Sequence, residues 1–361
     1  MNTSTNKKTR DSNIELLRIV CILMIIAHHF AIHPVWNFDT NSITANRVLI
    51  QALCIGGKLG VNCFLLISGY YLVGSKGRSI KSIARIWLQI FFYSVGITLL
   101  FVALGKTECS IKSLVSACLP ITTVTWNYAS AYFVLILFTP FLNVFLNSLP
   151  KQKYERMLLL MFFCWCIIPT ITGKSFESNY LLWMAVLYAV GGYIRLYPNK
   201  YTENRKTAAW GVVISYALYL GSVIIMDLLG TKMGFFSDSA REIRFGQMQM
   251  LPCVAMAVSL FLLFKNTKIG SNRVVNTLAT AVFGVYLIHE HSLVRAVLWT
   301  EIFKNTDHIN SPMLVLYLIA AVLSIYVVST IIELARSFLI ERLYMMPISN
   351  FCDKLENIIK K

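Results

Sequence analysis

The sequence predicts an all-α polytopic integral membrane protein with about ten transmembrane helices and with both termini in the cytoplasm. Hydrophobic residues make up 57% of the 361-residue chain, and charged residues only 14%. Apolar runs of roughly 17 to 25 residues, the length that a membrane-spanning helix needs, recur along the whole chain. This composition excludes a soluble globular domain.

Ten apolar runs, each bounded by charged residues or by Pro and Gly, are close to the roughly 20 residues of a membrane span. They cover residues 13–33, 50–73, 86–105, 128–147, 156–172, 180–196, 208–229, 247–265, 274–298 and 312–335. No long linker or internal repeat separates them, so we predict one transmembrane domain over residues 1–361 with a cytoplasmic tail at 336–361. Mixed apolar and charged residues from 338 to 361 predict a short interfacial helix or a frayed tail.

The loops between these runs alternate in charge. Of the 33 Lys and Arg residues, 22 lie in the terminal segments and in the loops on the side of the N-terminus. Cytoplasmic loops of membrane proteins carry this excess, which places both termini in the cytoplasm. The net charge of +16 therefore reflects orientation in the membrane and does not indicate nucleic acid binding.

The nine cysteines lie mostly inside the predicted spans, where they behave as small apolar residues. Cys109 and Cys118 share one predicted outside loop, where a disulfide between them is one of two open alternatives.

The first span, NIELLRIVCILMIIAHHFAIH, carries ionisable residues that lipid does not tolerate, so this helix is expected to line a protein cavity. His29 follows Arg18 by eleven residues. On a helix, this spacing returns within roughly 20° of the same direction after a rise of about 16 Å. Both side chains can then face one cavity at different depths. Glu15 lies one turn before Arg18 and can pair with it, whereas His28 points about 100° away from His29.

The second span contains GGKLGVNCFLLISGYYL and is followed by a basic strip, RSIKSIARIW. Its glycines favour tight helix packing, and the polar Lys58 and Asn62 favour a cavity wall equally well. In the strip, Lys81 and Arg85 either obey the positive-inside rule or bind the phosphates of a cytoplasmic ligand.

Two later segments complete the set of candidate residues. The fourth span begins at aromatic residues near Trp126, which a membrane-interface belt explains well. The ninth span ends in FGVYLIHEHSLVR, where Tyr286 and His289 share one helix face.

Taken in order, these motifs resemble membrane-bound acyltransferase family 3. Glu15, Arg18 and His29 match its opening motif, although the acidic residue is more usually Asp. GVNCFLLISGYYL resembles its second-span motif, and the strip ending at Arg85 resembles its basic motif. Trp126 and the Tyr286 to His289 segment also match in kind and order. The resemblance covers nearly the whole chain and implies the stand-alone form, a cell-surface polysaccharide O-acetyltransferase without an appended hydrolase-like domain.

The resemblance implies transfer of an acetyl or other short acyl group from cytoplasmic acyl-CoA. The acceptor would be a hydroxyl of a cell-surface polysaccharide, such as an exopolysaccharide of the cell envelope, or its lipid-linked precursor. The expected location is a bacterial-type cytoplasmic (inner) membrane. Histidine titrates near neutral pH and suits the removal of a hydroxyl proton, so His29 is the expected general base.

The predicted site residues fall into a catalytic group, a group that contacts the donor and a group that lines the acceptor cavity. The catalytic group is expected to contain His29, Arg18 and Glu15, and acetyl-CoA is expected to contact Arg18, Lys81, Arg85, Ser68 and Asn62. The wall of the acceptor cavity is expected to contain Lys58, Trp126, Tyr286 and His289. Metal-ligand spacing is absent from the sequence motifs, and the reaction needs no metal.

Two other classes of protein also use buried Arg and His residues. A secondary transporter would place them in a proton or substrate pathway, but repeated Gly- or Pro-broken spans are not evident. A glycan flippase or polymerase would favour large Arg-rich outside loops. Dependence on acetyl-CoA distinguishes the enzyme from both alternatives.

Overall fold

The computed structural model describes residues 10–39, 42–233 and 244–359, and within these ranges the chain is helical with no strand. Seven of the described helical segments are long and apolar enough to cross a membrane. They are α1 (Ser12–Ile32), α2 with α3 (Ala45–Leu53 and Gly56–Leu72), α4 (Ile80–Ala103), α6 (Asn127–Ser148), α7 with α8 (Lys151–Phe162 and Ile168–Thr172), α10 (Arg205–Met233), and α16 with α17 (Leu314–Ala335 and Glu341–Ile359).

An eighth candidate span is bent. It comprises α13 (Arg273–Thr280) and α14 (Val282–His289), followed after a 74° bend by a segment that begins with α15 (Ser292–Val297). Two further helices, α9 (Tyr180–Leu196) and α12 (Leu251–Lys265), are apolar but shorter than the candidate spans.

The predicted all-α polytopic fold is confirmed, and each of the ten predicted runs coincides with one of these elements. Three of them differ from a full continuous span. The run at 274–298 is broken near Glu290, and α9 and α12 are shorter than a usual span. The cytoplasmic location of the termini stays a prediction.

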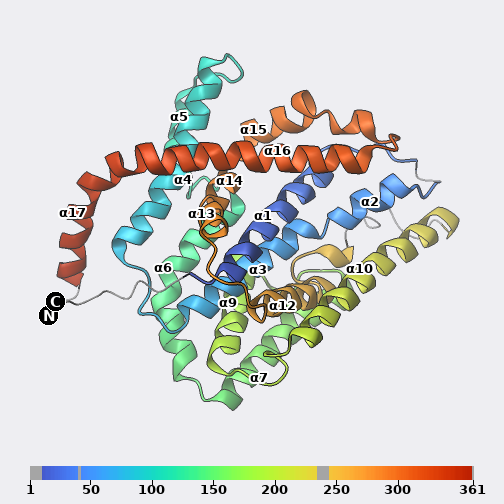
Figure 1. Cartoon of the computed structure of the whole chain (residues 1–361), viewed down its shortest axis with the longest axis horizontal. Coiled ribbons are helices and arrows are strands. Elements are labelled where there is room, and N and C mark those ends of the chain that lie inside the picture. Colours follow the sequence, from blue (N-terminus) through green and yellow to red (C-terminus); the bar gives the residue numbers. More distant parts are fainter. Residues whose placement is uncertain (1–9, 40–41, 234–243, 360–361) are drawn as a thin grey trace.

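Helices α1 and α3 form the centre of the molecule (Figure 1). Helix α1 contacts α3, α12, α13, α14 and α16, and α3 also packs on α9 and α12. In the most apolar part of each span, 61% of α1 and 67% of the α2–α3 segment is buried inside the protein, whereas only 28% of α4 is buried. The polar residues of the first span therefore lie inside the protein.

Glycine permits the close approach of α3 to its neighbours. A Cβ atom on Gly57 would lie 2.3 Å from the His28 ring, and one on Gly69 would lie 2.0 Å from the carbonyl oxygen of Tyr188 on α9. On the α9 side, a Cβ atom on Gly191 would lie 2.3 Å from the carbonyl oxygen of Leu66. The tight-packing interpretation of these glycines is confirmed, because a larger residue would separate the helices.

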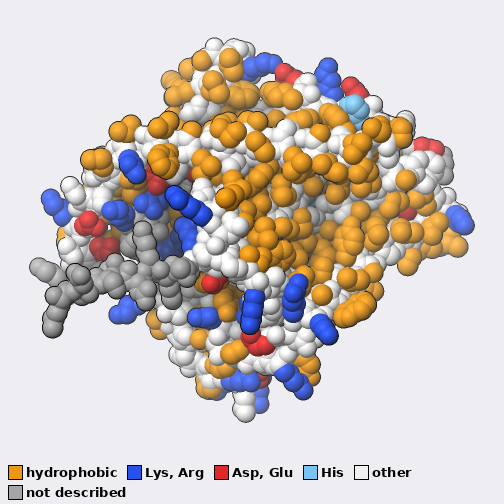
Figure 2. Space-filling model, in the orientation of Figure 1, with side chains coloured by type: hydrophobic (Ala, Val, Ile, Leu, Met, Phe, Trp, Pro, Cys, Tyr) orange, Lys and Arg blue, Asp and Glu red, His pale blue; other side chains and the backbone are white. Residues whose placement is uncertain are grey.

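The surface agrees with a membrane environment. Figure 2 shows apolar side chains over most of this face, with Lys and Arg gathered towards its lower left and lower edge. Large apolar side chains such as Phe141, Trp210 and Ile331 are more than 60% exposed. Such a surface is typical of a protein that contacts lipid.

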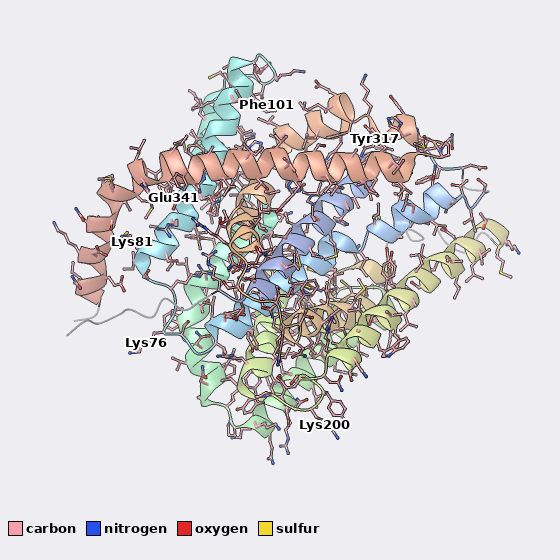
Figure 3. The ribbon with its side chains drawn as sticks, viewed as in Figure 1. Lys76, Lys81, Phe101, Lys200, Tyr317 and Glu341 are labelled. Carbon is pink, nitrogen blue, oxygen red and sulfur yellow. The ribbon has the colours of Figure 1, made fainter. Side chains whose placement is uncertain are left out.

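The C-terminal segment is an ordered helix and not a frayed tail, since α17 packs against α4. At its start, Glu341 accepts hydrogen bonds from the buried Arg336 at 2.9 Å and forms an ion pair with Arg85 at 2.9 Å. Farther along α17, Ser349 accepts a hydrogen bond from Lys81, and Figure 3 shows Lys81 and Glu341 on these two neighbouring elements. These contacts attach the tail to the basic strip.

The predicted outside loop between α4 and α6 is partly helical. It contains a short helix, α5 (Ile111–Cys118), with a capping box at Ser110 and Ser113. Cys109 and Cys118, at its two ends, are both exposed and free, so the structure contains no disulfide between them.

Candidate active site

Helix α1 carries the principal polar side chains at its two ends. Glu15 and Arg18 lie in and just after its first turn, His29 lies in its last turn, and His33 caps its C-terminus. Glu15 Oε2 lies 3.7 Å from Arg18 Nε, so the predicted pair forms. The two ends of α1 reach two different cavities.

The first cavity, which we call the arginine cavity, has a volume of about 420 Å³. Its polar lining comprises Arg10, Glu15, Arg18, Ser68, Arg78, Arg85, Gln89 and Thr280. Glu15 pairs with Arg18 and Glu341 pairs with Arg85, which leaves the arginines in excess over carboxylates. Such a set of planar guanidinium groups suits an anionic ligand, and phosphate above all.

The second cavity, which we call the histidine cavity, has a volume of about 320 Å³. Its polar lining comprises His28, His29, Lys58, Thr125, Trp126, Asn127, Tyr128, Tyr180, Tyr286, Glu290 and Arg295. Titratable groups of both signs therefore surround the end of α1, beside aromatic rings that can pack against a sugar.

The two cavities have a common wall. Ile25, Val61, Tyr128 and Tyr286 line both of them. The rings of Tyr128 and Tyr286 contact each other edge to face, with centroids 5.6 Å apart. The two cavities therefore adjoin at these four side chains.

His29 makes a network through one of its ring nitrogens. Its Nδ1 lies 3.0 Å from His289 Nε2 and 3.1 Å from Glu290 Oε2. On the other side of its ring, His289 Nδ1 lies 2.6 Å from the carbonyl oxygen of Val285, which can only accept. His289 therefore carries its proton on Nδ1 and presents an accepting Nε2 to His29.

These contacts assign the tautomer of His29. Both neighbours of Nδ1 are acceptors, so Nδ1 carries the proton and donates it to His289, while the Glu290 carboxylate lies at ion-pair distance. The opposite nitrogen, Nε2, makes no hydrogen bond within the described residues and is not one of their fully enclosed polar atoms. His29 thus offers an unprotonated nitrogen at the histidine cavity, with its other side held in place.

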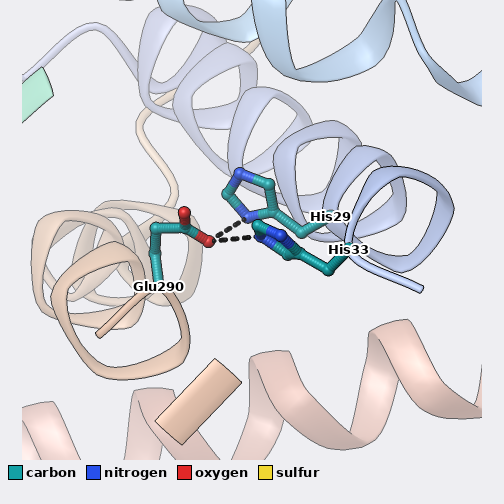
Figure 4. A group of neighbouring side chains, drawn as sticks. All are labelled: His29, His33 and Glu290. Atoms are coloured by element: carbon teal, nitrogen blue, oxygen red, sulfur yellow. Dashed lines mark hydrogen bonds and ion pairs between the residues drawn. The ribbon is translucent and has the colours of Figure 1, made fainter. Parts of the chain in front are cut away.

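Glu290 is the centre of this network. Its Oε2 lies 3.1 Å from His29 Nδ1 and 2.9 Å from His33 Nε2 (Figure 4). Its Oε1 accepts from Arg295 at 3.0 Å. The break between α14 and α15 produces this arrangement, because it turns the Glu290 side chain towards α1. The carboxylate orients His29 and can stabilise a positive charge on it.

Lys58 adds an uncompensated charge to the same cavity. Its ammonium group makes no hydrogen bond or ion pair within the described ranges, although it lines the cavity with Glu290. A chamber with a free cation beside a proton-accepting nitrogen can stabilise negative charge near that nitrogen.

The structure brings most of the predicted site residues to the two cavities. Glu15, Arg18, Ser68 and Arg85 line the arginine cavity. His29, Lys58 and Trp126 line the histidine cavity, and Tyr286 lines both.

Three predicted residues lie elsewhere. Asn62 is fully buried, where it donates to the carbonyl oxygen of Met248 at 2.7 Å and accepts from Trp183 at 3.2 Å. Lys81 lines neither cavity and bonds to Ser349. His289 is also fully buried and reaches the cavity only through His29.

Several residues of the site were not among the predicted ones. Arg78 and Gln89 line the arginine cavity, and Glu290, His33 and Arg295 form the network around His29. His33 carries a signal in the sequence, because it lies one helical turn after His29. Glu290 carries a weaker one, its position next to His289.

Comparison with known proteins gives one match. The model of acyltransferase family 3, described as an acyltransferase domain, matches residues 11–333. No curated protein and no solved structure matches the chain.

Proposed function

The chain belongs to this acyltransferase family, and from that premise we propose that it moves an acetyl or other short acyl group from acyl-CoA to a sugar hydroxyl. The proposed acceptor is a cell-surface polysaccharide or its lipid-linked precursor. The observation that carries the proposal is the state of His29. Its Nδ1 donates to His289 beside the Glu290 carboxylate, and its Nε2 makes no hydrogen bond with any residue that the structure describes.

In the proposed reaction, His29 acts as the general base. The acceptor hydroxyl oxygen attacks the thioester carbonyl carbon, and Nε2 takes the hydroxyl proton as the new C–O bond forms. Glu290 stabilises the resulting imidazolium through Nδ1. The tetrahedral intermediate then breaks its C–S bond, and the leaving thiolate receives the proton from His29. General base catalysis of this kind typically contributes about 10²- to 10⁴-fold in rate.

We place the phosphates of the donor in the arginine cavity. Arg18, Arg78 and Arg85 line it, and a guanidinium binds phosphate through two parallel hydrogen bonds. From Arg18 to His29 the helix rises about 16 Å, which an extended pantetheine arm can span. The thioester then reaches His29 past the wall that the two cavities share.

The charge of the loops supports an orientation. The arginine cavity includes Arg78 and Arg85 of the basic strip, which the positive-inside rule assigns to the cytoplasm. The donor would enter from that side, and the histidine cavity would open towards the opposite face of a bacterial-type inner membrane. The proposed reaction uses no metal as a cofactor.

A labelling experiment tests the proposal. Purified protein is incubated with radiolabelled acetyl-CoA and extracts of lipid-linked glycans, for the wild type, His29→Ala and His308→Ala. His308 is a histidine outside both cavities and serves as the control. We expect label in glycan with the wild type and the control, and a loss of at least about 100-fold with His29→Ala. Equal labelling by His29→Ala would refute the assigned base, and no labelling with any extract would direct attention to transport.

A further inference from the structure

Three side chains with metal-binding atoms converge at the end of α1, and two of them, His29 and Glu290, line the histidine cavity. His29 and His33 lie one turn apart at the end of α1, and Glu290 faces them from the break between α14 and α15 (Figure 4). One ligand atom of each residue lies within 4.8 Å of those of the other two. The proton transfer proposed above involves His29 and Glu290 but assigns no role to His33.

The distances are close to those of a bound ion. Zinc lies about 2.0–2.2 Å from nitrogen and oxygen ligands, so two ligand atoms at a tetrahedral angle are about 3.4 Å apart. In the structure, Glu290 Oε2 lies 3.1 Å from His29 Nδ1 and 2.9 Å from His33 Nε2. His29 Nδ1 and His33 Nε2 lie within 4.8 Å of each other, so rotations of the two rings would be needed to bring all three atoms to these separations.

The surroundings also suit an ion. Arg295 bonds to Oε1 of Glu290 and leaves Oε2 directed at the two imidazoles. Partners of this kind orient metal ligands in known sites. The side chains of His29, His33 and Glu290 are 10%, 18% and 14% exposed, so an ion in the cavity can reach them.

The geometry points to a binding site for a divalent transition-metal ion, Zn²⁺ being the best match, formed by His29, His33 and Glu290. Two imidazoles and one carboxylate are ligands that zinc prefers, and three protein ligands with one open position are a common arrangement for it. Lys58 and Arg295 line the same cavity and oppose a further positive charge, so the affinity is lower than in a structural zinc site.

The ion would act as a reversible inhibitor, an effect that rests on the proposed function. Coordination through Nδ1 moves the proton of the neutral His29 ring to Nε2. That nitrogen then has no lone pair for the acceptor hydroxyl. Coordination of the metal and acceptance of the hydroxyl proton therefore exclude each other at the His29 ring.

A spectroscopic titration tests binding without any catalytic assay. The full-length protein in detergent is titrated with Co²⁺, whose visible absorption reports coordination, and the bound Co²⁺ is then displaced with Zn²⁺. We compare the wild type with His33→Ala, Glu290→Gln and the control His308→Ala. We expect one ion per chain in the wild type and control, and an affinity about tenfold or more lower in each ligand variant. Thermal melting of each variant checks that it is folded.

The outcomes separate this site from the proposed reaction. Absence of a saturable Co²⁺ signal, or equal affinity in the folded ligand variants and the control, would overturn the metal site. A bound ion that leaves acetyl transfer unchanged at saturation would overturn the inhibition. Metal binding by a protein that transfers no acetyl group to any acceptor would leave the site standing and refute the proposed function.

Discussion

Replacement of Glu290 by Gln tests how much its charge contributes to catalysis. The carboxylate lies 3.1 Å from His29 Nδ1. At an effective dielectric constant of about 20, two unit charges at this separation attract each other by about 5 kcal/mol. Arg295 and His33 share the carboxylate, so we assign roughly half of this energy, about 2–3 kcal/mol, to the imidazolium of the transition state. Loss of that energy lowers kcat by about 30- to 150-fold.

The assay is steady-state acetyl transfer with varied acetyl-CoA. Because Glu290 lies in the histidine cavity and not the arginine cavity, we expect KM for acetyl-CoA to stay within about twofold while kcat falls. Glu301→Gln is the matched control, since Glu301 forms an exposed ion pair with Lys106 at 2.7 Å outside both cavities. A kcat for Glu290→Gln equal to that of the control, or a loss confined to KM, would refute the role of the carboxylate.

Three further predictions concern the donor site and the packing of the helices. Arg18→Lys replaces a planar fork by a point charge, so we expect KM for acetyl-CoA to rise about tenfold; an unchanged KM would contradict the donor site. Lys81→Met removes a cation that lines neither cavity, and we expect KM for acetyl-CoA to change less than twofold. A tenfold rise would indicate that Lys81 contacts the donor after all. Gly69→Ala places a Cβ atom 2.0 Å from the carbonyl oxygen of Tyr188, so we expect a loss of about 1–3 kcal/mol in stability, measured as a lower melting temperature. Gly221→Ala is the control and should melt no lower than the wild type, since its Cβ would meet no atom within 4 Å beyond its chain neighbours and the backbone of its own helix.

Much of the fold could be predicted because each span carries its own signal. Length and apolarity located the ten runs, and charged residues in the first span indicated a buried helix. The bend after His289 could not be predicted, since no proline or glycine marks it. The short helix α5 could not be predicted either, because it contains too few apolar residues to give a helical pattern.

Helix geometry predicts contacts within the site only where one helix supplies both partners. The spacing of Arg18 and His29 along α1 depends on helix geometry alone. Contacts such as that of His29 with Glu290 join residues about 260 positions apart, and their pairing depends on how α1 and α14 pack. Asn62 illustrates the same dependence on packing. Its polar side chain suggests a contact with the donor, but it lines neither cavity and instead accepts a hydrogen bond from Trp183 and donates one to Met248.

The wall between the two cavities has an electrical consequence. A membrane protein with a cavity on each side of its centre must still prevent the leak of ions. The membrane potential favours such a leak by about 2.3 kcal/mol per unit charge for each 100 mV. Ile25, Val61, Tyr128 and Tyr286 line both cavities, so a pantetheine arm that reaches from one cavity to the other must pass these four side chains. In the proposed orientation the bound donor would fill the same passage, and shortening these side chains should therefore increase ion leak when no donor is bound.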